Sequence, residues 1–116
     1  MGYNNGASAV SLCTLTNSVE INKWNYILAT WSKSTNTTNT MKVYLNGVEK
    51  ATYTNTLSWT TNTNCGLQIG RYSTGSSYVF NGVLDDLRIY KEALTQAQIQ
   101  QHYAYGLPTH QNLAAR

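Results

Sequence analysis

The stretch MKVYLNGVEKATYT, residues 41–54, decides the fold of this chain of 116 residues. It consists of two strand-like runs that are joined by Asn46 and Gly47. Both central residues of a type I′ turn adopt positive φ angles, and Asn-Gly is the pair that tolerates this best. The stretch therefore predicts a β-hairpin.

Other strand-like runs lie on both sides of this hairpin and are bounded by turn residues. Residues 9–16 alternate in polarity, and residues 24–31 (WNYILATW) are strongly apolar, as expected of a central strand. Residues 66–71 are typical of a short strand, and residues 79–90 of the last long one. Because the chain is long enough for only one modest core, this order predicts one all-β domain, an antiparallel β-sandwich.

One short helix is predicted near the carboxyl end, over residues 95–105. Thr95 and Gln98 have the spacing of a capping box, in which two side chains satisfy backbone N–H groups at the start of a helix. One face of this helix is expected to seal an edge or an end of the sandwich. That face holds Ile99, His102 and Tyr103.

The helix is expected to end at Gly106, because glycine readily takes the left-handed conformation that follows a last helical turn. Pro108 comes next and should prevent the helix from resuming. The sequence therefore predicts a domain over residues 1–106 and an irregular tail over residues 107–116.

The composition predicts a surface built from amides and hydroxyls rather than from ion pairs. Only 11% of the residues are charged, whereas the chain contains 16 Thr and 13 Asn. This balance favours an exported protein that is located outside the cell or on its surface.

Charge and hydropathy argue against two kinds of partner. The net charge is +3 and the basic residues form no run, so the chain lacks the basic stripe that phosphate backbones need. No apolar stretch approaches the length of a membrane-spanning helix. We therefore expect neither nucleic-acid binding nor a membrane span.

Cys13 and Cys65 are the only two cysteines, and they lie in different predicted strands. Two thiols are too few for a zinc cluster of the usual kind. A disulfide between neighbouring strands and two buried free thiols are both compatible with the sequence.

Asp85 and Asp86 are two of only five acidic residues, and they follow one another in the predicted strand 79–90. Neighbours in a strand point to opposite faces of the sheet. The two carboxyl groups of a retaining glycosidase lie about 5–5.5 Å apart across one cleft, which such neighbours cannot achieve. No serine or cysteine lies in a G-x-S-x-G elbow either. We predict that the chain is not an enzyme.

Two other roles stay open for this pair. A calcium ion takes six to eight oxygen ligands, many of them carbonyl groups, so one aspartate beside Asn-rich loops can suffice. In the alternative, Asp85 accepts backbone hydrogen bonds and Asp86 pairs with Arg88, which makes both residues part of the framework.

Five motifs in their order along the chain resemble the laminin G-like, concanavalin A-like jelly-roll family. The resemblance covers roughly residues 9–105. The motifs are KWNYI (23–27), MKVYLNGV (41–48), LQIGR (67–71), YVFNGVLDDLRIY (78–90) and KEALTQAQIQQHY (91–103).

The resemblance implies a non-catalytic, extracellular β-sandwich module that binds glycans or proteins and often holds one calcium ion. It implies that Asp85 or Asp86 is the metal-linked acid, with Asp85 favoured, and that Phe80 and Gly82 are structural. Domains of the family usually have several strands before the one that begins at Trp24. Because few residues precede Trp24 here, we expect exposed sheet edges and self-association as a dimer or larger assembly.

The leading hypothesis for function is a recognition module for a glycan or a surface protein. Sugar sites combine aromatic rings with amide and hydroxyl groups, and this sequence is rich in both. The alternative is a structural subunit of a surface filament or another self-associating assembly. The candidate ligand-binding residues near predicted loops are Trp59, Tyr72, Tyr78, Asn62 and Asn64.

Overall fold

The computed structural model divides the chain into two compact units, one formed by Met1–Trp59 with Lys91–Arg116 and the other by Thr60–Tyr90. Each unit is considered by itself. The residues that the structure describes are 2–4, 9–11, 18–34, 38–56, 69–71 and 79–114; of 2–4, 9–11 and 111–114 it describes the backbone alone.

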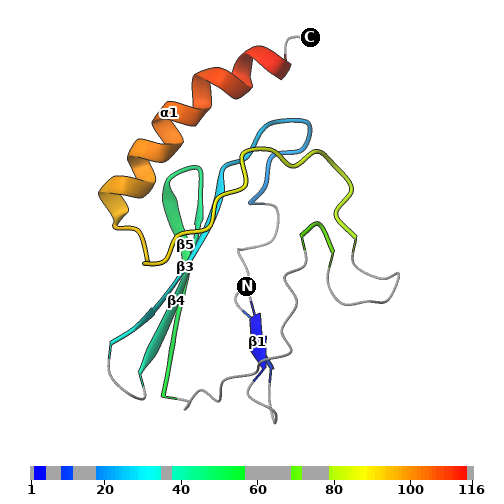
Figure 1. The fold of residues 1–116 in the computed structure, drawn as a ribbon. Coiled ribbons are helices and arrows are strands. Elements are labelled where there is room, and N and C mark those ends of the chain that lie inside the picture. The colour runs from blue at the N-terminus through cyan, green and yellow to red at the C-terminus, as the bar shows by residue number, and fades with distance from the viewer. Residues whose placement is uncertain are drawn as a thin grey trace. The chain divides into compact units, whose positions relative to one another are not determined.

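The first unit contains a three-stranded antiparallel sheet made of β3 (Ile27–Lys33), β4 (Asn39–Leu45) and β5 (Val48–Asn55) (Figure 1). The strand order is β3-β4-β5, so β4 is the central strand of the described sheet. Among the described strands β3 pairs with β4 alone, so the central position expected for the strand over residues 24–31 stays a prediction.

The predicted hairpin is confirmed. Asn46 has a φ of 52° and Gly47 a φ of 77°, which are the positive values that a type I′ turn requires. The pairing shifts by one residue between Val43, which faces Ala51, and Tyr44, which faces Glu49. Lys50 is therefore the extra residue of a β-bulge.

One face of this sheet is apolar. Met41, Val43 and Leu45 alternate along β4 and are all buried. In the register of the sheet, Trp31 and Tyr53 lie on either side of Met41. Residues that are paired across strands share a face, so this row belongs to the core side of the sheet.

The opposite face is held by polar side chains. Glu49 accepts hydrogen bonds from Lys42 Nζ at 2.8 Å and from Thr52 Oγ1 at 2.7 Å. Thr40 and Thr54 are linked across the strands by their hydroxyl oxygens at 3.3 Å. Hydroxyl groups and the Glu49 carboxylate thus make the contacts on this face, and Lys42–Glu49 is the one ion pair among the described residues of the sheet.

Two further strands pair near the amino end of the first unit. β1 (Gly2–Asn4) and β2 (Ala9–Ser11) form a short antiparallel ladder. The predicted strand over residues 9–16 is confirmed at 9–11, and its remainder lies outside the described residues.

Helix α1 (Gln96–Ala114) begins where the sequence predicts. The Thr95 N–H donates to Gln98 Oε1 at 2.9 Å, and the Gln98 N–H donates to Thr95 Oγ1 at 3.4 Å. This reciprocal pair is the expected capping box. No helix in the described part of the chain is both long and apolar enough to cross a membrane.

The predicted end of the helix was wrong, because α1 continues through Gly106 and Pro108 as far as Ala114. The expected irregular tail is therefore helical over residues 107–114. The least exposed positions of α1 recur every three or four residues, as on one face of a helix. Tertiary packing of this stripe outweighs the low helix propensity of glycine and proline. The stripe consists of Ile99, His102, Tyr103, Gly106, Leu107 and His110.

In the second unit, residues 69–71 and 79–90 are described. Arg71 and Val79 form an isolated antiparallel bridge, and the Phe80 N–H donates to the Gly70 carbonyl at 2.7 Å. Beyond that bridge the strand predicted over residues 79–90 was wrong. Asp86 has a φ of 54°, which is incompatible with a continuous extended strand.

Phe80 packs on Gly82. A Cβ atom at Gly82 would lie 2.9 Å from Phe80 Cε1, which is closer than such atoms can approach without rearrangement. This contact agrees with the structural role that the resemblance implies for both residues.

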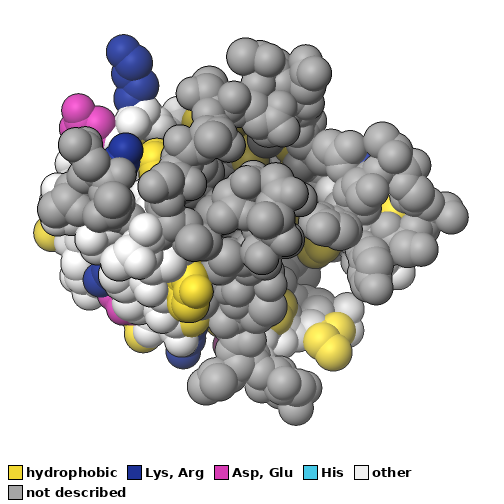
Figure 2. All heavy atoms as spheres, turned by 90° about the horizontal axis from the view of Figure 1, so that it is seen from below, with side chains coloured by type: hydrophobic (Ala, Val, Ile, Leu, Met, Phe, Trp, Pro, Cys, Tyr) yellow, Lys and Arg dark blue, Asp and Glu magenta, His cyan; other side chains and the backbone are white. Residues whose placement is uncertain are grey.

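The described residues thus contain one three-stranded sheet, one two-stranded sheet and one helix. The second layer of the sandwich stays a prediction. Lys and Arg side chains on the face drawn in Figure 2 stand apart from one another, in keeping with the absence of a basic run in the sequence.

Candidate functional site

The turn of the hairpin is the point where three segments of the first unit meet. The Tyr26 N–H donates to Asn46 Oδ1 at 2.9 Å, and the Asn46 N–H donates to the Tyr26 carbonyl at 2.8 Å. From α1, Gln96 Nε2 donates to the Gly47 carbonyl at 2.8 Å. The Tyr103 and Tyr26 rings lie 6.1 Å apart between their centroids. These contacts fix the loop before β3, the hairpin turn and α1 against one another.

The loop before β3 is closed by the side chain of Asn25. Its Nδ2 donates to the carbonyl groups of Glu20 at 2.8 Å and Lys23 at 2.9 Å, while its Oδ1 accepts the Glu20 N–H at 3.2 Å. Asn22, with a φ of 59°, makes the tight turn in between. One buried or half-buried amide thus organises the whole loop.

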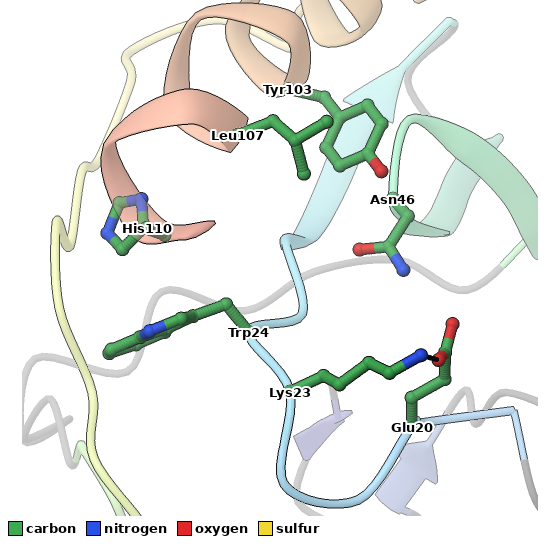
Figure 3. Close-up of a pocket in the computed structure, with 7 residues that line it drawn as sticks. All are labelled: Glu20, Lys23, Trp24, Asn46, Tyr103, Leu107 and His110. Atoms are coloured by element: carbon green, nitrogen blue, oxygen red, sulfur yellow. Dashed lines mark hydrogen bonds and ion pairs between the residues drawn. The ribbon is translucent and has the colours of Figure 1, made fainter. Parts of the chain in front are cut away.

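Lys23 and Glu20 form an ion pair at the rim of this loop (Figure 3). Their side chains are 70% and 57% exposed, respectively, so solvent and salt screen the pair. The hydrogen bond to the Glu20 carboxylate raises the pKa of the Lys23 ammonium above its usual value, so Lys23 is charged at neutral pH.

Trp24 lies against His110 from the second half of α1. The ring centroids are 4.9 Å apart, and the planes meet at 60°, an edge-to-face arrangement. His110 Nδ1 is 2.8 Å from the Gly106 carbonyl oxygen. Because a carbonyl oxygen only accepts, Nδ1 carries the hydrogen of this bond. His110 therefore has a fixed ring orientation beside Trp24.

A pocket of about 410 Å³ opens between these elements. Within the described residues, Trp24 Nε1, Asn46 Nδ2 and Tyr103 Oη make no hydrogen bond, so they are available to a ligand. Figure 3 shows the Trp24 and His110 rings together on one side of the opening and the Tyr103 ring on the other. The pocket is lined by Glu20, Lys23, Trp24, Asn46, Tyr103, Leu107 and His110.

Trp59, Tyr72, Tyr78, Asn62 and Asn64 all lie outside the described residues, so their predicted role stays a prediction.

Sequence reasoning missed the pocket because its residues were assigned other roles. Trp24 was assigned to a strand, Asn46 to a turn and His110 to the tail. The spacing of Ile99, Tyr103 and Leu107 would have extended the helix, since an apolar stripe continues past Gly106. No local signal places Trp24 beside that stripe.

The predicted metal candidates are both in the second unit. Asp85 Oδ1 accepts the Asp86 N–H at 2.7 Å. Arg88 donates to both carboxylate oxygens of Asp86, from Nε at 3.0 Å and from Nη2 at 2.9 Å. The predicted pairing of Asp86 with Arg88 is confirmed, and it raises the pKa of the guanidinium.

This geometry bears on the calcium site that the family resemblance implies. A bidentate contact from Arg88 engages both oxygens of Asp86, which makes Asp85 the less engaged of the two carboxylates as a metal candidate; both roles stay predictions. Within the described side chains, no group of three or more His, Cys, Asp or Glu residues could hold a metal ion. Asp85 would need several oxygen ligands from other residues.

Comparison with protein families places the chain in a known class. A laminin G-type family model, described as the concanavalin A-like lectin/glucanases superfamily, matches residues 1–100. The chain therefore belongs to this family, as the sequence motifs indicate. Laminin G-like modules are generally non-catalytic.

A solved structure is also similar to the chain. It contains residues 221–444 of an S-layer domain-containing protein from Clostridium thermocellum ATCC 27405, with a TM-score of 0.53 and 27% sequence identity. The match covers 83% of this chain and 45% of that one, so the chain spans less than half of the solved protein. Comparison with curated proteins gives no significant match.

Proposed function

We propose that this chain is a non-catalytic recognition module, located outside the cell or on its surface, and that the pocket beside α1 binds a glycan. The observation that carries the proposal is the Trp24 ring in a pocket with unpaired amide, indole and hydroxyl groups. The C–H face of a sugar packs on an aromatic ring, while its hydroxyls bond to such groups.

Two further observations support a surface location. The similar solved structure belongs to an S-layer domain-containing protein. The chain itself is poor in charge and rich in Thr and Asn, as expected of a surface exposed outside the cell. Neither observation names a sugar.

The proposal is tested by binding of the purified chain to an array of immobilised oligosaccharides, followed by titration. We expect Trp24→Ala to abolish binding and Trp24→Phe to retain part of it, because phenylalanine keeps a stacking face. Tyr105→Ala is the matched control, since Tyr105 is an aromatic residue on α1 that is 73% exposed and does not line the pocket. Absence of any glycan binding by the unaltered chain would rule out the proposal.

A structural role in a self-associating assembly is the second candidate. Val83, Leu87 and Ile89 are 73%, 63% and 73% exposed, an unusual density of large apolar side chains at a surface. Light scattering behind a sizing column, at two concentrations, tests this role. A dimer or larger species that Ile89→Lys dissociates would support it, and a monomer at both concentrations would contradict it.

Calcium binding is a separate proposal that concerns Asp85. The bidentate Arg88 contact engages the Asp86 carboxylate, which supports Asp85 as the one that supplies a ligand. Further oxygens would come from residues outside the described ones or from water.

A further inference from the structure

We propose that the pocket selects uncharged sugars, and that Glu20 is the specificity-determining residue. The inference rests on the proposed glycan-binding function and narrows it to one ligand class. Three observations support it. Lys23 and Glu20 face the pocket as an ion pair, Glu20 Oε1 makes no hydrogen bond within the described part of the chain, and Asn25 fixes the backbone of the loop that contains both residues.

The positive and the negative charge that face the pocket, on Lys23 and Glu20, belong to one ion pair. Lys23 is the only lysine or arginine among the described lining residues, and its ammonium binds the Glu20 carboxylate directly. The remaining titratable groups of the lining, Tyr103 and His110, come from α1. The ammonium of Lys23 and the carboxylate of Glu20 therefore neutralise each other at the edge of the pocket.

The Glu20 carboxylate can accept hydrogen bonds from sugar hydroxyl groups, and it repels the anionic groups of acidic sugars. Its Oε2 is engaged by Lys23, whereas its Oε1 makes no hydrogen bond within the described part of the chain. A free carboxylate oxygen accepts a hydrogen bond from a sugar hydroxyl. A uronate or sulfate has no such proton at its charged group, and it would meet a like charge instead.

An acidic ligand would have to compete with Glu20 for the Lys23 ammonium, and the loop keeps this competitor close by. Asn25 bonds to the backbone of both Glu20 and Lys23, so the loop holds their backbone positions three residues apart, at a spacing from which the two side chains reach each other. The backbone that carries the ion pair is therefore fixed next to Trp24 before any ligand arrives. Such preorganisation reduces the ordering cost of binding.

The decisive experiment compares the unaltered chain with Glu20→Gln against two sets of probes. The neutral set consists of cello-, xylo- and chito-oligosaccharides, and the acidic probe is oligogalacturonate. We expect the unaltered chain to bind a neutral probe with an affinity that changes little between about 50 and 500 mM salt. Glu20→Gln should weaken that binding by roughly tenfold, the effect of one charged hydrogen bond.

The same substitution should create a new specificity. Removing the carboxylate frees the Lys23 ammonium, so Glu20→Gln should gain oligogalacturonate binding that salt suppresses. Glu92→Gln is the matched control, because it removes the same charge from an exposed residue that does not line the pocket. It should alter neither affinity. Circular dichroism of each variant confirms that the loop substitution leaves the fold intact.

The outcomes separate this inference from the proposed function. Salt-sensitive binding of oligogalacturonate by the unaltered chain would overturn the selectivity and leave glycan binding in place. Neutral-sugar binding that Glu20→Gln and Trp24→Ala both leave unchanged would overturn the role of this pocket. No binding to any probe would overturn both proposals together.

Discussion

Tyr103 of α1 packs against Gly47 at the tip of the hairpin. A Cβ atom built on Gly47 would lie 3.2 Å from Tyr103 Cδ1 and 3.5 Å from Tyr103 Cβ. Gly47 also has a φ of 77°, a conformation that other residues rarely adopt. The glycine is therefore required twice, by the backbone of the turn and by the ring that covers it.

Gly47→Ala should destabilise the fold by about 2 kcal/mol, because backbone strain adds to a crowded contact with Tyr103. Urea denaturation gives this change in the free energy of unfolding. Gly70→Ala is the control for the backbone alone, since Gly70 has a φ of 73° but the nearest atom to the added Cβ among the described residues, Leu84 Cδ1, is 3.6 Å away. Equal losses in the two variants would mean that Tyr103 can move aside.

Gly106→Ala should stabilise the chain by about 0.5–1 kcal/mol, because alanine is the better residue inside a helix. The added Cβ would come only within 4.0 Å of His110 Nδ1. Thermal denaturation followed by circular dichroism measures the change. A loss of stability would instead indicate a left-handed Gly106 and a helix that ends there.

Thr95→Ala should cost about 0.5–2 kcal/mol, since it removes the side-chain oxygen that caps the first turn of α1. The fall in the free energy of unfolding is measured with urea. Thr109→Ala provides the comparison, because Thr109 is an exposed residue within α1 and no cap depends on it. Similar losses in both variants would contradict the capping role.

Glu49 should make stability depend on pH in acid. Its hydrogen bonds from Lys42 and then Thr52 lower the pKa of the carboxyl below its ordinary value of 4.5. The folded state thus holds the ionised form more strongly than the unfolded chain does. This stabilisation is complete above the ordinary pKa and is lost as the pH falls through the lowered pKa.

Unfolding by urea at pH 7 and at about pH 3 in the unaltered chain and in Glu49→Gln tests this dependence. The variant should be less stable than the unaltered chain at neutral pH, and the difference should shrink in acid. Glu92→Gln, an exposed acid outside the sheet, should leave the pH dependence unchanged. A difference that is constant across the pH range would exclude the proposed linkage.

If Asp85 holds calcium, millimolar calcium should raise the unfolding temperature, and Asp85→Asn should remove the effect. Differential scanning fluorimetry with calcium, magnesium or EDTA measures the shift. Asp86→Asn serves as the comparison and should leave the calcium response in place, because Arg88 already occupies that carboxylate. An unfolding temperature that does not change with calcium would contradict the calcium site and would leave both aspartates with a structural role.

Local chemistry made the hairpin and the helix start predictable. The Asn46-Gly47 pair has few backbone alternatives, and Thr95 with Gln98 satisfies its own hydrogen bonds within four residues. The end of α1 was missed because the packing of Leu107 and His110 on distant segments overrides the signals at Gly106 and Pro108. The pocket was missed for the same reason, because its residues come together only through contacts between segments that are distant in the sequence.

The strand predicted over residues 79–90 failed for a different physical reason. Its alternating pattern favours an extended conformation, yet a strand also needs neighbours for its backbone hydrogen bonds. Asp86 instead turns back and bonds to Asp85 and Arg88, an arrangement in which local polar contacts replace a ladder. The inference that Asp85 and Asp86 point to opposite faces of a sheet assumed a regular strand, so it does not apply here.

The three-way junction at the hairpin turn has a thermodynamic consequence. The Tyr26–Asn46 contact joins positions 20 residues apart, and the Gln96–Gly47 contact joins positions 49 apart. The pocket therefore exists only while α1 is docked, and no excised peptide of this chain can reproduce it. A bound ligand stabilises the docked state by mass action. Occupancy should thus be readable from slower hydrogen exchange in the amides of the second half of α1.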